Sequence, residues 1–81
     1  MIFGVYSMRD LKAEFTAPTF SMNDAVALRS FEAAIVQAHG ELFTHKEDFQ
    51  LFRIGSFDTE AGVLFPEKLP VLIGDGKDVV L

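Results

Sequence analysis

Residues 24–38 have the apolar spacing of a single amphipathic helix. All of the predicted strands must bury their apolar side chains against this one helix. At about 100° per residue, one side of the helix carries seven mainly apolar residues: Asp24, Ala27, Leu28, Phe31, Ala34, Ile35 and Ala38. Ser21 can cap its start, and Gly40 suits its end. Since one helix covers one face of a sheet, the other face must meet solvent, a partner subunit or a ligand.

Four strands are predicted around this helix. Residues 1–8 and 49–57 alternate in the manner of strands, and residues 15–20 form a strand that Pro18 restricts to an edge or a bulge. Residues 63–65 return from a turn at residues 58–62 and stop at Pro66. The order strand-strand-helix-strand-strand predicts an α+β fold, in which a four-stranded antiparallel sheet carries one amphipathic helix on one face.

The composition changes after Pro66. The remaining residues are aliphatic, lack aromatic side chains and are interrupted by Gly74-Asp75-Gly76. We therefore predict a core domain over residues 1–66 and a C-terminal tail or arm over residues 67–81. A short extra hairpin of residues 71–73 with 79–81 is the alternative.

Composition excludes several classes of protein. The chain has 81 residues, of which 49% are hydrophobic, and this indicates one globular domain. A net charge of −5 argues against a general electrostatic grip on nucleic acid or an acidic membrane. Without cysteine there are no disulfides, thiol catalysis or cysteine zinc sites. No segment predicts a membrane span or a signal peptide, so we expect a cytoplasmic protein.

No motif predicts a catalytic centre, a metal site or a cofactor, and we expect no enzyme. Five potential ligands lie within ten residues, but their spacing matches no helical ligand pair and favours a solvated loop: His39, Glu41, His45, Glu47 and Asp48. The segment at residues 74–78 lacks the pattern of a phosphate loop or a calcium loop, so a plain turn is favoured.

Aromatic residues are the remaining signal. Nine phenylalanines and one tyrosine exceed what so small a core easily hides. Rings on an open sheet can stack on single-stranded bases while nearby cations hold phosphates. The candidates are Tyr6, Phe49 and Phe57 for bases, and Arg9, Lys12, Lys46 and Arg53 for phosphates. We place Arg53 on the open side, because Phe52 and Ile54 suit the core better. The alternative is that the rings are core or are buried by dimerisation.

A second, weaker apolar strip lies on the opposite side of the predicted helix. It consists of Val26, Arg29, Ala33 and Val36. The strip is either a scatter of small surface residues or a contact between subunits. Together with the surplus of aromatic rings, it predicts a dimer or a larger homo-oligomer.

Three stretches together carry a resemblance to a known family. They are Val5-Tyr6 with Phe20, residues 23–31, and residues 45–58 with the following turn. They resemble the small nonstructural protein of gokushovirus-type microviruses, phages with circular single-stranded DNA. In that family an A-x-R-x-F helix start precedes an E-D-aromatic-x-L-aromatic-x-I/L-G-x-aromatic-D/N strand. The resemblance covers residues 1 to about 70.

The resemblance implies a phage accessory protein in the cytoplasm of a bacterial host. It implies DNA binding during the switch from genome replication to packaging, but no particular binding residues. We therefore expect a nonenzymatic protein that binds single-stranded DNA and associates with itself. The alternative is a homo-oligomeric interaction or scaffold module that does not bind nucleic acid.

Overall fold

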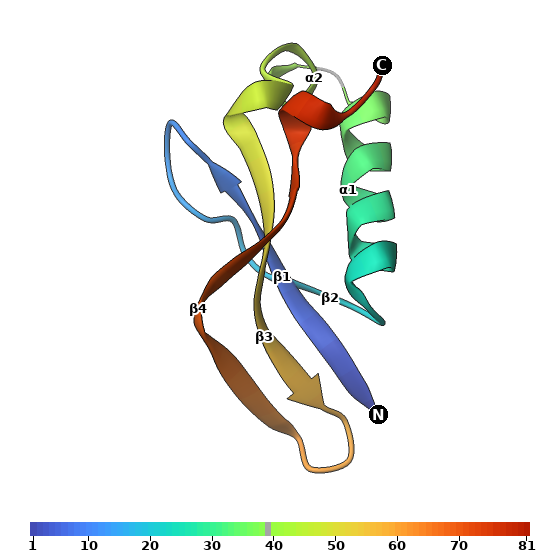
Figure 1. Ribbon diagram of the computed structural model, residues 1–81, viewed down its shortest axis with the longest axis vertical. Coiled ribbons are helices and arrows are strands. Elements are labelled where there is room, and N and C mark those ends of the chain that lie inside the picture. The colour runs from blue at the N-terminus through green and yellow to red at the C-terminus, as the bar shows by residue number, and fades with distance from the viewer. Residues whose placement is uncertain (39) are drawn as a thin grey trace.

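The computed structural model describes residues 1–38 and 40–81, except for the side chains of Glu41 and Phe43. Its elements are β1 (Ile2–Asp10), β2 (Thr19–Ser21), α1 (Asp24–Gln37), α2 (Glu41–Thr44), η1 (Lys46–Asp48), β3 (Phe49–Asp58), β4 (Val63–Asp75) and η2 (Gly76–Asp78), the two η elements being 3-10 turns. The strands form one antiparallel sheet in the order β2-β1-β3-β4, and α1 lies against one of its faces (Figure 1). The predicted α+β fold is confirmed.

The helix α1 begins at an asparagine cap. Asn23 is extended, and its side-chain oxygen accepts a hydrogen bond from the backbone N–H of Val26 at 2.9 Å. The predicted cap at Ser21 is wrong, because that residue ends β2 and pairs with Gly4. Three residues of the predicted stripe are buried, Ala27, Phe31 and Ile35, which confirms the face on which the helix packs.

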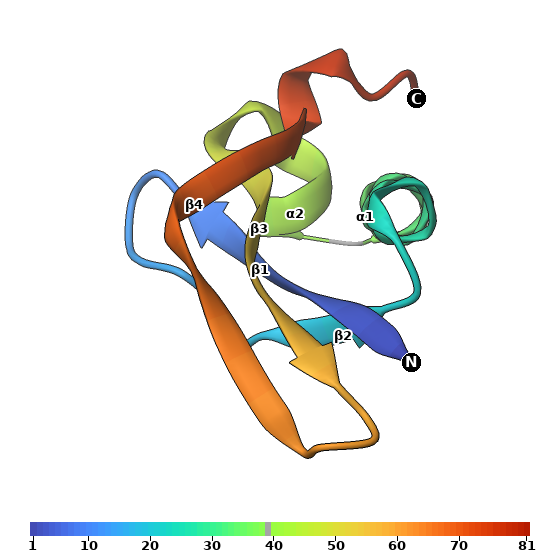
Figure 2. The same ribbon diagram turned by 60° about the horizontal axis from the view of Figure 1, so that its bottom comes forward.

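The core lies between α1 and the upper half of the sheet. Its buried members are Tyr6, Ala27, Phe31, Ile35, Phe49, Leu51 and Val79. A helix of 14 residues spans about 21 Å, whereas the molecule is 40 Å long. Consequently the β3–β4 hairpin and the start of β1 project beyond the N-terminal end of α1 (Figures 1 and 2). Among the described residues, no helix is long and apolar enough to cross a membrane.

The strand β4 is far longer than predicted. The expected end at Pro66 is wrong, because β4 continues to Asp75 and takes most of the expected tail into the sheet. The strand is irregular between Pro66 and Val71. These two residues are five positions apart in β4, yet their partners in β3, Gly55 and Arg53, are only two positions apart. Prolines are tolerated there because β4 is an edge strand, where a missing N–H breaks no ladder on the outer side.

Two other segments differ from the expected secondary structure. The strand predicted over residues 15–20 shrinks to Thr19–Ser21, and Phe15 makes a single bridge to Arg9. The loop predicted over residues 41–48 contains the short helix α2 and the 3-10 turn η1. The elements α2 and η1 have four and three residues, and elements of that length are too short for hydrophobic periodicity to reveal.

The chain end packs against the turn before β3. Backbone of η2 lies directly on backbone of η1, so that a Cβ atom at Gly76 would overlap the carbonyl oxygen of Lys46. Three residues later, Val79 is 7% exposed and belongs to the core. The close approach of Gly76 therefore allows the chain end to close the upper end of the core.

We expect Gly76→Ala to lower the free energy of unfolding by about 1–3 kcal/mol, because a methyl group there forces the two turns apart. Chemical denaturation followed by circular dichroism measures the change. Lys77→Ala is the control, since Lys77 is the exposed neighbour in the same turn. Equal stability of the two variants would show that the turns are not in tight contact.

Candidate nucleic-acid interface

The sheet face away from α1 is lined by aromatic side chains. Side chains of directly paired residues share a face. Phe57 pairs with Phe3 of β1 and Leu64 of β4, and Phe52 pairs with Ser7 and Leu72. Since Tyr6 reaches α1, the alternate positions Phe3 and Ser7 face the other way, and their partners do so too.

Two ring pairs organise this surface. Phe15 meets Phe52 with centroids 5.5 Å apart and planes at 68°, and Phe20 meets Phe57 at 5.7 Å and 66°. These are edge-to-face contacts, which hold the rings in fixed orientations. Phe15 is 44% and Phe20 is 52% exposed. We call the set Phe3, Phe15, Phe20, Phe52 and Phe57 the aromatic face.

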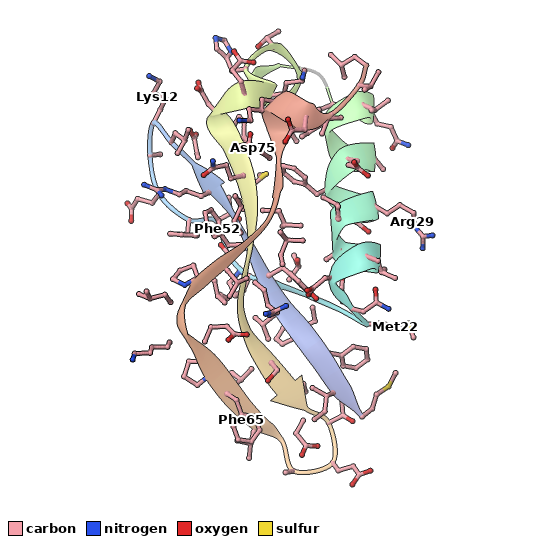
Figure 3. The ribbon with its side chains drawn as sticks, in the orientation of Figure 1. Lys12, Met22, Arg29, Phe52, Phe65 and Asp75 are labelled. Carbon is pink, nitrogen blue, oxygen red and sulfur yellow. The ribbon has the colours of Figure 1, made fainter. Side chains whose placement is uncertain are left out.

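A cation borders the aromatic face. The guanidinium carbon of Arg9 lies 5.9 Å from the centroid of the Phe15 ring, within the range of a cation–π contact. Arg9 is exposed, as is Lys12 in the loop after β1 (Figure 3). The arrangement therefore combines exposed rings with accessible positive charge at one end.

The predicted base-stacking residues Tyr6 and Phe49 are not on this surface. Tyr6 is 1% and Phe49 is 8% exposed, and both belong to the core beneath α1. The Tyr6 hydroxyl donates a hydrogen bond of 2.6 Å to Oδ1 of Asp24. Burial and this carboxylate raise the pKa of Tyr6 to about 12. A base cannot stack on either ring in this structure, so the assignment of both residues was wrong.

Arg53 also lies on the helix side, contrary to its predicted place. Its Nη1 donates to Oδ2 of Asp24, and its Nε donates to Oε2 of Glu67 at 2.9 Å. The hydrogen bond from Tyr6 and the bond and charge of Arg53 hold the pKa of Asp24 below its ordinary value. Arg53 is therefore an ion-pair partner that ties β3 to α1 and β4.

Lys46 is engaged by the backbone. Its ammonium group donates to the carbonyl oxygens of Gly76, Lys77 and Val79 at 3.2, 3.2 and 2.9 Å. An ammonium has three protons, so these acceptors use all of them. The prediction that Lys46 contacts phosphate is wrong for this conformation, and its role is to fix the chain end.

Of the predicted nucleic-acid residues, Phe57 belongs to the aromatic face and Arg9 borders it, while Lys12 is exposed in the loop after β1, near His45 and Asp48. Sequence analysis missed Phe15, Phe20 and Phe52. Phe15 and Phe20 lie in a segment predicted as a strand. The number of aromatic residues, which exceeds what so small a core can bury, indicated that some rings are exposed, but not which ones. Phe52 was assigned to the core because an aromatic residue suits the core better than the neighbouring Arg53, whereas in the structure Arg53 faces α1 and Phe52 faces away.

The predicted subunit strip lies on the outer side of α1. Arg29 points away from the sheet (Figure 3), Ala33 is exposed and Val36 is 49% exposed, while Val26 is partly buried. A contact between subunits there stays a prediction. His39 of the considered ligand cluster lies outside the described residues, and no three potential ligands converge in the rest.

A family model described as Phage ORF5 protein matches residues 3–79, which is nearly the whole chain. No curated protein and no solved structure matches.

The single tyrosine makes the Asp24 contact measurable. We expect the phenolate absorbance of the folded protein to titrate with a midpoint near 12, against about 10 in denaturant. Since the folded pKa is raised, the stabilising effect is complete below pH 10 and is lost as pH rises from about 10 through about 12. Tyr6→Phe should remove that part of the pH dependence of unfolding. A midpoint near 10 in the folded protein would contradict the buried contact.

We expect Arg53→Met to lower the free energy of unfolding by about 1–2 kcal/mol, because two partly exposed carboxylates lose their partner. Affinity for single-stranded DNA should not change, since the guanidinium lies on the side of α1. Denaturation and a binding titration on the same samples separate the two effects. Loss of affinity without loss of stability would return Arg53 to the binding site.

Proposed function

Because this chain belongs to the Phage ORF5 protein family, we propose that it is a nonenzymatic phage protein that binds single-stranded DNA on its aromatic face. The observation that carries the proposal is the exposure of two rings, Phe15 and Phe20, on the sheet face away from α1. They are held edge-to-face against Phe52 and Phe57 respectively, and Arg9 lies beside Phe15. The earlier resemblance to the nonstructural protein of gokushovirus-type microviruses supports the choice of ligand.

Stacking supplies most of the binding in this proposal. Every base has an aromatic face, so an exposed ring binds single strands with little sequence preference. The rings of the aromatic face come from three strands and the loop before β2, and this spacing gives a strand several contacts along one surface. A single strand therefore crosses the sheet on the side opposite α1.

Electrostatics makes a smaller contribution. The net charge is −5, and Lys46 and Arg53 are engaged within the protein. Arg9 and Lys12 are left as the phosphate contacts of the predicted set. Two phosphate contacts give a salt slope of roughly −1.4 on single strands, shallow for a nucleic-acid-binding protein. Because so few phosphate contacts attract the DNA only weakly, the protein binds single strands where their concentration is high, as during genome replication and packaging in the host cytoplasm.

The test is a binding titration with a labelled single-stranded oligonucleotide at two salt concentrations. Phe20→Ala should weaken binding roughly 5- to 100-fold, the loss of one stacked base. Arg9→Ala should weaken it and make the salt slope shallower by about 0.7. Arg29→Ala is the matched control, since it removes an exposed arginine from the outer side of α1.

Equal effects of Arg9→Ala and Arg29→Ala would contradict an interface at the aromatic face. So would an unchanged affinity of Phe20→Ala in a protein that binds DNA. Circular dichroism of each variant confirms that the fold is intact before the affinities are compared.

The second candidate function is a homo-oligomeric module whose aromatic face contacts another copy. The exposure of Phe20, Leu64 and Leu72, each above half, favours a partner of some kind on this surface. The same variants distinguish the two candidates. If Phe20→Ala abolishes self-association and the parent protein binds no DNA, the module is the correct function.

A further inference from the structure

The rings of the aromatic face form two separate groups. Each group contains one of the two edge-to-face pairs, Phe20 with Phe57 and Phe15 with Phe52. Phe3 joins the first pair, because it lies opposite Phe57 in the sheet. Since β1 runs upward in Figure 1, we call Phe3, Phe20 and Phe57 the lower ring group, and Phe15 and Phe52 the upper ring group.

The register of the sheet separates the two groups along β1. Phe57 pairs with Phe3, whereas Phe52 pairs with Ser7, four residues further along β1. Since a strand advances about 3.3 Å per residue, these two points of the sheet are about 13 Å apart. Between Phe3 and Ser7 the same face carries Val5, which is 6% exposed and has no ring. A base can therefore stack on the protein at either end of this interval but not in its middle.

A single strand meets both ring groups when it runs parallel to β1. Arg9 extends the same line, because it follows Ser7 by two residues on the same face and its guanidinium lies beside Phe15. A strand perpendicular to β1 would pass from one ring group to an aliphatic side chain of β4, Leu64 or Leu72. Such side chains have no π-face on which a base can stack. The direction along β1 therefore offers more contacts, two stacking positions followed by a cation.

This geometry determines how many nucleotides the aromatic face binds. Stacked nucleotides follow one another at about 3.4 Å along a strand. The interval of about 13 Å thus corresponds to about four nucleotide steps in a stacked strand and to fewer steps in an extended one. A segment of about three to five nucleotides reaches from one ring group to the other. A mononucleotide or a dinucleotide occupies one group alone.

We propose that the ligand of the aromatic face is a segment of single-stranded DNA about three to five nucleotides long, which lies along β1 with a base at each ring group. This inference rests on the proposed function, because it takes the aromatic face as the surface that binds DNA. Binding at one ring group holds the strand near the other, so both contacts contribute only when one strand reaches both. The net charge of −5 increases this dependence on length, since phosphate contacts contribute little.

A binding titration with a series of oligothymidylates of increasing length tests the proposal. The affinity of the parent protein should rise roughly 5- to 100-fold from the dinucleotide to the pentanucleotide, the gain of a second stacked base, and only slowly beyond that length. Phe15→Ala and Phe20→Ala each remove the exposed ring of one group. In either variant the steep rise should disappear, and the pentanucleotide should bind about as weakly as the dinucleotide binds to the parent protein. Circular dichroism checks that each variant is folded.

Phe65→Ala is the matched control. Phe65 is 53% exposed, about as much as Phe20, but it lies on the other face of the sheet. Its partner in β3, Ser56, pairs with Gly4, and a Cβ atom at Gly4 would overlap the Tyr6 ring on the side of α1. This variant should keep the affinity and the length dependence of the parent protein.

The outcomes distinguish this inference from the proposed function. If the parent protein binds strands and Phe20→Ala weakens binding equally at every length, the aromatic face binds DNA at one ring group only. The inference is then wrong, while the proposed function stands. An affinity of the parent protein that rises only in proportion to length has the same meaning. If the parent protein binds no strand of any length, both are wrong.

Discussion

The carboxylate of Asp24 holds the N-terminal end of α1 against the sheet, and the position of this helix determines which parts of the sheet stay exposed. One of its oxygens accepts from Tyr6 of β1 and the other from Arg53 of β3, which also binds Glu67 of β4. Four elements thus meet at one cluster of partly buried polar groups. Because each carboxylate and the hydroxyl have partners, the cluster stabilises the arrangement despite the cost of removing charge from water.

This cluster exists because β3 is irregular at its centre. Val5 and Tyr6 are neighbours, yet their partners Gly55 and Arg53 are two residues apart, so Ile54 is the extra residue of a bulge. Before the bulge Phe49, Leu51 and Arg53 face α1, and after it Phe57 faces away. The bulge thereby places a cation under the helix terminus and a ring on the open side of the same strand.

The sequence predicts the helix, its buried stripe and the succession of strands along the chain, since hydrophobic period and turn residues determine these locally. It does not predict the bulge, because strict alternation assigns Arg53 and Phe57 to one face. Nor does it predict the role of Lys46, whose carbonyl partners lie more than 29 residues away in sequence. Of the proposed set, only Phe57 belongs to the aromatic face and only Arg9 borders it, and the binding role of both stays a prediction.

The position of β4 at the edge of the sheet explains how this strand exposes side chains on both faces of the hairpin. As the outer strand it tolerates Pro66 and Pro70, and the irregular stretch between them brings Glu67 to Arg53. Below that stretch, β4 has regular pairs with β3, and neighbouring residues alternate between the two faces of a hairpin that α1 does not cover. Leu64 and Phe65 consequently belong to different surfaces although they are adjacent in sequence.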